Sequence, residues 1–165
     1  DHRDLHSFPT RRSSDLVVGH SAGGHLAAML LACEWARFAP DLPEDLVYNA
    51  LSISGVFDLE PLRHTPFLKD SLRLTPEQVR MASPAWLPKA LPDTEEERGV
   101  LLSVAGGDES AEFQRQARLI REAWGEAVVP ICETLPGLNH FSVLDALVQP
   151  RHRLNHLARQ LLDLT

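Results

Sequence analysis

A glycine-flanked serine turn constrains the fold of this chain more than any other feature. The apolar run at residues 16–18 (LVV) leads directly into residues 19–24 (GHSAGG), and residues 24–37 have the apolar spacing of a helix. A G-x-S-x-G sequence between a strand and a helix places the serine on a sharp turn, at the N-terminal end of a helix dipole that favours negative charge. We therefore predict that Ser21 is a nucleophile and that the amide of Ala22 donates to an oxyanion.

Strand-like and helix-like segments alternate along the rest of the chain. Further strands are expected at residues 50–57, 100–105 and 128–135, and further helices at residues 112–124 and 141–164, the last interrupted near Pro150. Pro130 predicts that the last strand lies at an edge, because proline cannot donate to a central ladder. The alternation predicts an α/β fold class, with a mostly parallel sheet flanked by helices.

Two segments depart from this alternation. Residues 59–98 contain recurring prolines among short helical pieces, which predicts a lid-like excursion from the core. Residues 1–16 have no strand or helix period and resemble a translated sequencing-adaptor remnant, so we interpret them as a non-native, disordered leader. Residues 17–165 then form one partial domain.

The composition limits the binding partners and the cellular compartment that we expect for this chain. The net charge of −7 disfavours nucleic acid and anionic membranes as partners, because both reward clustered Lys and Arg. The chain has no apolar run long enough to span a bilayer, and its polar start lacks a secretory signal. Cys33 and Cys132 match no metal or redox spacing and are expected to be free thiols in a reducing cytoplasm.

A serine nucleophile needs a base and a carboxylate that orients the base. In folds built around this turn the chain order is serine, acid, histidine. His140 follows a predicted strand in a short loop and fits the base better than the other histidines. The acid belongs after the strand at residues 100–105, where Asp108 and Glu109 are adjacent. Spacing alone leaves both open, and a helix N-cap is the competing role for either.

Four stretches carry a more specific resemblance. Residues 19–26 (GHSAGGHL), 53–59 (ISGVFDL), 109–116 (ESAEFQRQ) and 136–141 (PGLNHF) together resemble the kynurenine formamidase (arylformamidase) branch of the α/β hydrolases. The resemblance covers nearly all of residues 17–165. It places the acid on Glu109, where the family more usually has Asp, and Asp108 is kept as the alternative.

The resemblance implies an activity and a substrate. It implies a serine hydrolase that cleaves N-formyl-L-kynurenine to kynurenine and formate in tryptophan catabolism, without a metal or other cofactor. The lid-like segment would shape an aromatic pocket, with Trp86 as a candidate wall or a packed lid residue, while Trp35 and Trp124 are expected in the core. The alternatives are a carboxylesterase that acts on small esters and an inactive truncated gene model. The oligomeric state stays open, a homodimer of the intact protein included.

The resemblance reaches only the C-terminal half of the α/β-hydrolase fold. The strands upstream of the serine turn do not precede it here, nor does the His-Gly-Gly-type loop that supplies further oxyanion amides. Losing one oxyanion donor costs about 10²–10³ in turnover. Residues 17–18 would also form an unpaired apolar edge. We therefore predict that this chain alone is nearly inactive and is either poorly soluble or self-associating.

Overall fold

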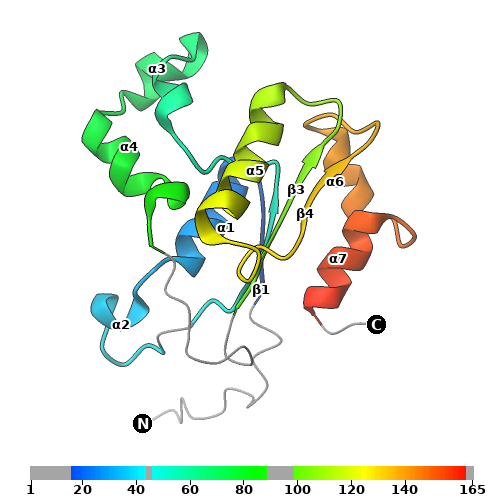
Figure 1. Ribbon diagram of the computed structural model, residues 1–165, viewed down its shortest axis with the longest axis horizontal. Coiled ribbons are helices and arrows are strands. Elements are labelled where there is room, and N and C mark those ends of the chain that lie inside the picture. The colour runs from blue at the N-terminus through cyan, green and yellow to red at the C-terminus, as the bar shows by residue number, and fades with distance from the viewer. Residues whose placement is uncertain (1–15, 44–45, 89–98, 163–165) are drawn as a thin grey trace, which may run out of the picture.

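Four parallel strands in sequential order form the centre of the protein. The computed structural model describes residues 16–43, 46–88 and 99–162 (Figure 1). The sheet order is β1-β2-β3-β4, and every neighbouring pair is parallel. The strands are β1 (Leu16–His20), β2 (Asn49–Ile53), β3 (Leu101–Gly106) and β4 (Cys132–Leu135). The predicted α/β class with a parallel sheet is confirmed.

The two central strands are buried along their whole length. All residues of β2 and β3 are buried, as expected for strands that helices cover on both faces. Alternate residues face opposite sides, so Ala50 and Leu101 belong to one apolar cluster and Leu51 and Leu102 to the other. This alternation fixes the register of the sheet, because a slip by one residue would exchange the two faces.

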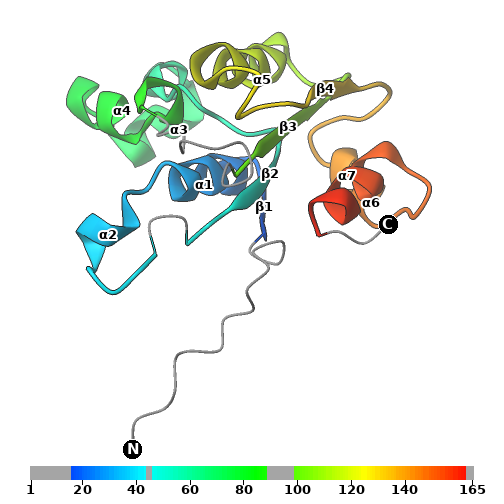
Figure 2. The same ribbon diagram turned by 60° about the horizontal axis from the view of Figure 1, so that its bottom comes forward.

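Helices cover both faces of this sheet. Helices α1 (Ala22–Leu31) and α5 (Ala111–Trp124) pack on one face, and α6 (Ser142–Leu147) and α7 (Arg153–Leu161) lie on the other (Figure 2). Ile120 and Trp124 anchor α5 in the first cluster. Leu154, Leu157 and Leu161 anchor α7 in the second.

Three predicted elements are shorter in the structure than in the sequence analysis. The helix predicted at residues 24–37 divides into α1 and the short α2 (Trp35–Phe38). The strand predicted at residues 50–57 ends at Ile53, because Ser54 has a positive φ of 51° that a strand cannot continue. The strand predicted at residues 128–135 begins at Cys132, after Pro130.

Other predictions are confirmed. Strand β4 lies at an edge of the sheet, as Pro130 indicated. The final helical region is interrupted at Pro150, between α6 and α7. Residues 1–15 of the predicted leader lie outside the described residues, and Leu16, which was predicted to be disordered with them, is instead the first residue of β1.

The excursion predicted at residues 59–98 consists of short helices over its described part, residues 59–88. Its elements are η2 (Glu60–Arg63), α3 (Pro66–Leu72), α4 (Pro76–Ala82) and η3 (Pro84–Trp86). A capping box starts α4: the Thr75 hydroxyl accepts from the Gln78 amide, and the Gln78 side chain accepts from the Thr75 amide. Residues 89–98 lie outside the described residues. These helices project beside α1 and α5 at one end of the sheet (Figure 1).

Strand β1 ends the sheet on the side opposite β4. Within the described ranges no strand pairs with its outer edge, and Val18 is 42% exposed. An unpaired apolar edge is a template for pairing with another chain. Self-association therefore stays a prediction, and sedimentation velocity at increasing concentration checks it: a concentration-independent monomer would contradict it.

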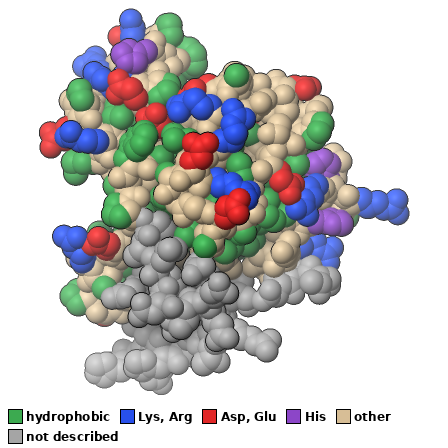
Figure 3. Space-filling model, viewed as in Figure 1, with side chains coloured by type: hydrophobic (Ala, Val, Ile, Leu, Met, Phe, Trp, Pro, Cys, Tyr) green, Lys and Arg blue, Asp and Glu red, His purple; other side chains and the backbone are tan. Residues whose placement is uncertain are grey.

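The surface charges and the lengths of the helices relate to the predictions about nucleic acid and membranes as partners. Over the face in Figure 3, Lys and Arg side chains are interspersed with Asp and Glu among the described residues. No helix within the described ranges is both long and apolar enough to cross a membrane. The absence of a nucleic-acid partner stays a prediction.

Candidate active site

The predicted nucleophile lies on a strained turn between β1 and α1. Ser21 has φ 57° and ψ −116°, a conformation that a non-glycine residue rarely adopts and that costs about 1–3 kcal/mol. Its amide donates to the carbonyl of Ile53 at 2.9 Å, which fastens the turn to the end of β2. A side chain at Gly19 would place a Cβ atom 2.0 Å from the carbonyl oxygen of Gly23. Glycine at position 19 is therefore a steric requirement of this tight turn.

The predicted base and acid are in contact. Nδ1 of His140 lies 2.7 Å from Oε2 of Glu109, and the Glu109 side chain is fully buried while that of His140 is 25% exposed. An ionised carboxylate only accepts, so the proton of this hydrogen bond is on Nδ1. In the neutral ring, Nε2 then carries a free lone pair. This is the tautomer that a general base needs.

The structure separates the two adjacent acids that spacing left open. Asp108 is exposed, and its amide donates to the carbonyl of Leu138 at 3.0 Å. Glu109 turns its carboxylate inward against His140. The geometry therefore places Glu109 behind the imidazole, the position that the resemblance implies, and leaves Asp108 in the surface turn.

The second oxygen of the Glu109 carboxylate is held by two donors. The amide of Gly106 donates to Oε1 at 2.7 Å, and the hydroxyl of Ser54 also donates to Oε1. A Cβ atom at Gly106 would lie 2.2 Å from the carbonyl oxygen of Leu138 and 2.9 Å from Oε1 of Glu109. A glycine is thus required where β3 ends, since a side chain would displace both the acid and the histidine loop.

Local hydrogen bonds fix the loop that carries His140. The side-chain oxygen of Asn139 accepts from the amides of Phe141 and Ser142 at 2.9 and 3.0 Å, and the Ser142 hydroxyl accepts from the Asn139 amide at 2.9 Å. Gly137 turns the chain ahead of it with φ 73°. The loop after β4 is therefore held at both ends of the histidine.

Aromatic rings pack against the imidazole. The rings of His20 and Phe113 each lie with their centroids 4.5 Å from that of His140, and the ring of Phe141 lies at 5.5 Å in an edge-on arrangement. Phe113 is on the first turn of α5. Residues 109–116, which carry part of the sequence resemblance, thus contribute a ring contact to the predicted base.

His20 joins the serine turn to the histidine loop. Its Nε2–H donates to the backbone carbonyl of His140 at 2.7 Å, and His20 directly precedes Ser21. Burial lowers the pKa of His20, against an opposing effect of this hydrogen bond. The His20 hydrogen bond thus joins the turn that carries the nucleophile to the loop that carries the base, at the same edge of the sheet.

The structure brings the predicted site residues to one end of the sheet, where β1, β2 and β3 end. These residues are Ser21, Ala22, Glu109 and His140. The Ser21 side chain makes no capping hydrogen bond to α1, so its hydroxyl is not committed to the helix. Ala22 is exposed at the first position of α1, and the amides of a first turn have no partner within the helix. A bond between the Ser21 hydroxyl and Nε2 of His140 stays a prediction.

A buried side-chain amide on α5 holds the two residues that directly precede the lid-like segment. The side-chain oxygen of Gln116 accepts from the amides of Phe57 and Asp58, both at 2.8 Å, and its nitrogen donates to the carbonyl of Asp58 and to Glu112. All hydrogen-bonding groups of this buried side chain are used. This role of Gln116 was not predictable from the sequence, because a side-chain amide on a helix gives no signal of its partner.

The three tryptophans differ in exposure. Trp86 is 53% exposed, and its indole nitrogen donates to Asp58 at 3.4 Å, so it remains a candidate wall of a pocket. Trp124 is buried, as predicted. Trp35 is only partly buried, because α2 separates from α1 and lies at the margin of the core.

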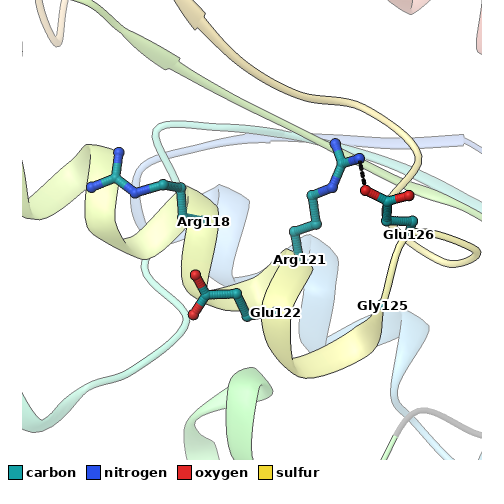
Figure 4. Close-up of a pocket in the computed structure, with 5 residues that line it drawn as sticks. All are labelled: Arg118, Arg121, Glu122, Gly125 and Glu126. Carbon is teal, nitrogen blue, oxygen red and sulfur yellow. Dashed lines mark hydrogen bonds and ion pairs between the residues drawn. The ribbon is translucent and has the colours of Figure 1, made fainter.

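A surface hollow at the other end of α5 is not part of this site. It is lined by Arg118, Arg121, Glu122, Gly125 and Glu126, and Arg121 pairs with Glu126 at 2.6 Å (Figure 4). Arg121 lies about 12 Å along the helix from Phe113. The two arginines and two glutamates that line the hollow balance in charge, and none of its lining residues is a nucleophile.

The chain is similar in sequence to kynurenine formamidases of two fishes. The chain is 31% identical over 143 residues to a kynurenine formamidase of Salmo salar and 30% identical over 142 residues to one of Danio rerio. Each match covers 86% of this chain and 47% of the relative. The chain thus spans about half the length of the curated relatives it matches. No protein-family model matches it.

Solved structures share the fold. The acylaminoacyl peptidase of Pyrococcus horikoshii superposes on 93% of this chain and 24% of its own, with a TM-score of 0.61 and 15% identity. An acetyl ester-xyloside bifunctional hydrolase from Caldicellulosiruptor lactoaceticus superposes on 88% of this chain and 54% of its own, with a TM-score of 0.56 and 16% identity. Both neighbours support the α/β-hydrolase fold for this chain.

Proposed function

We propose that this chain, which has the α/β-hydrolase fold and is similar to the kynurenine formamidases, carries the catalytic triad of a serine hydrolase for N-formyl aryl amides. The observation that carries the proposal is the bond between His140 and the buried Glu109, next to a serine on a strained turn. A buried carboxylate that fixes the Nδ1–H tautomer leaves Nε2 basic, and that is the state a serine nucleophile requires. The whole protein's substrate is N-formyl-L-kynurenine in this proposal.

The first half of the reaction forms a formyl-enzyme. Nε2 of His140 takes the Ser21 proton as the serine oxygen attacks the formyl carbon, and the Ala22 amide donates to the oxyanion. The imidazolium, stabilised by Glu109, then gives the proton to the arylamine nitrogen. The carbon–nitrogen bond breaks and the arylamine leaves. General-base and general-acid assistance of this kind contributes about 10²–10⁴ in rate.

The second half returns the free enzyme. His140 takes a proton from water, and the oxygen of that water attacks the formyl ester of Ser21. The imidazolium then gives the proton back to the serine oxygen as formate leaves. No external oxidant or reductant enters, and no step routes through a metal or cofactor.

A direct comparison of two substrates tests the choice of reaction. In the whole protein we expect a higher kcat/KM for N-formyl-L-kynurenine than for a short p-nitrophenyl ester, because the exposed Trp86 is a candidate contact for the aryl ring. Formate release and ester hydrolysis are each followed at matched enzyme concentration. A higher kcat/KM for the ester would favour the carboxylesterase alternative and overturn the formamide assignment.

A further inference from the structure

Ser54 occupies a position that glycine would fill at lower backbone cost. Its φ of 51° lies in the left-handed region, where a residue with a Cβ atom costs about 1–2 kcal/mol. Its amide still pairs with the carbonyl of Val104 at 2.7 Å, so the turn begins directly after the last ladder bond of β2. Serine in this position therefore needs a compensating contact from its side chain.

That contact is the Glu109 carboxylate. Ser54 is 1% exposed, so its hydroxyl is shielded from water and donates to a Glu109 carboxylate oxygen instead. A buried hydroxyl without a partner costs about 1–3 kcal/mol in proteins, and its bond to an ionised group recovers that cost. The Ser54 hydroxyl and the Gly106 amide thus both donate to Oε1, while Oε2 accepts from His140.

It matters that the two carboxylate oxygens of Glu109 accept from different donors, because the glutamate side chain is long. A glutamate has one more rotatable bond than an aspartate, so its carboxylate samples more orientations unless both oxygens are held. Two donors on Oε1 fix the plane of the carboxylate and direct Oε2 at Nδ1. Among the described residues, the imidazole contacts the Glu109 carboxylate and the rings of His20, Phe113 and Phe141.

We propose that Ser54 is a positioning residue for the catalytic pair: its hydroxyl holds Oε1 of Glu109 so that Oε2 faces Nδ1 of His140. The proposal deepens the proposed function and rests on it for its effect on catalysis. The hydrogen-bond geometry that it assigns is measurable without turnover.

Nuclear magnetic resonance of the whole protein, with its histidines labelled with ¹⁵N, tests the geometry. A hydrogen bond from Nδ1–H to a carboxylate gives a strongly downfield proton resonance, which is assigned to His140 by its loss in His140→Gln. We expect Ser54→Ala and Ser54→Gly to lose this resonance or move it upfield. The matched control is Ser103→Ala, because Ser103 is also 1% exposed, lies on neighbouring β3, and has a hydroxyl without a partner among the described residues. This control is expected to keep the resonance.

The two variants at position 54 separate the hydroxyl from the backbone. Glycine relieves the positive φ and keeps the turn, so Ser54→Gly folds even where Ser54→Ala does not. If Ser54 served only the turn, Ser54→Gly would keep the resonance, and the proposal would be overturned. Loss in Ser54→Gly with retention in Ser103→Ala supports it.

Kinetics in the whole protein supply the second readout. The free energy of a hydrogen bond to a charged group corresponds to a change of about 10–100-fold in a rate or equilibrium constant. We therefore expect kcat to fall by that factor in Ser54→Gly, with KM little changed. An unchanged kcat in an active enzyme would overturn the positioning role. If the wild-type protein has no hydrolase activity while the resonance still depends on Ser54, the proposed function fails and the hydrogen-bond assignment stands.

Discussion

Replacing Ser21 with alanine in the whole protein is expected to lower turnover of N-formyl-L-kynurenine by about 10⁶-fold, the scale found when a serine protease loses its nucleophile. Without the hydroxyl no formyl-enzyme forms, and only substrate binding and the oxyanion donors remain. Initial rates of formate release measure the effect. Ser71→Ala is the matched control, because Ser71 is an exposed serine on α3, and it is expected to keep full activity.

Stability measurements distinguish this loss from unfolding. Alanine at position 21 keeps the same strained φ, so Ser21→Ala should unfold at nearly the wild-type midpoint. Ser21→Gly relieves the strain and is expected to be inactive yet more stable, by up to about 1 kcal/mol. Substantial activity in either variant would show that Ser21 is not the nucleophile.

The second large effect is expected at Glu109. Glu109→Gln should lower kcat by about 10⁴-fold, because the amide presents a donor or a weaker acceptor to Nδ1 and the imidazole loses its tautomer and its stabilising charge. The side chain is fully buried, so solvent cannot replace the carboxylate. Steady-state kinetics on the whole protein, with circular dichroism to confirm folding, measure this effect.

Asp108→Asn is the matched control for that variant. Asp108 is the adjacent residue in the same turn but exposed, and the substitution is expected to change kcat by less than about threefold. The reverse pattern, with a large loss in Asp108→Asn and little in Glu109→Gln, would assign the acid to the alternative residue and contradict the geometry seen here.

The order of elements was predictable because it rests on patterns that survive in a single sequence. Apolar runs followed by helical spacing gave the alternation of strands and helices, and Pro130 and Pro150 marked an edge strand and a helix break that the structure confirms. These signals are local, and each reflects the burial or the hydrogen bonding of the residues that carry it.

Other features depend on three-dimensional contacts and were not predictable from spacing. Asp108 and Glu109 share one turn, and only the folded chain shows which carboxylate is buried against His140. The apolar pattern continues past Ser54 to Phe57, so periodicity extended the strand through a residue of positive φ. The roles of Ser54 and Gln116 arise from partners 55 or more residues away in sequence.

Labelling with a fluorophosphonate tests the central claim most directly, because such reagents modify a serine only when a base activates it. In the whole protein the account predicts one adduct, located on Ser21 by peptide mass spectrometry, with its formation slowed at least about 10²-fold by His140→Ala and unaffected by Asp108→Asn. An adduct on another serine, or equal labelling of Ser21 in His140→Ala, would contradict it.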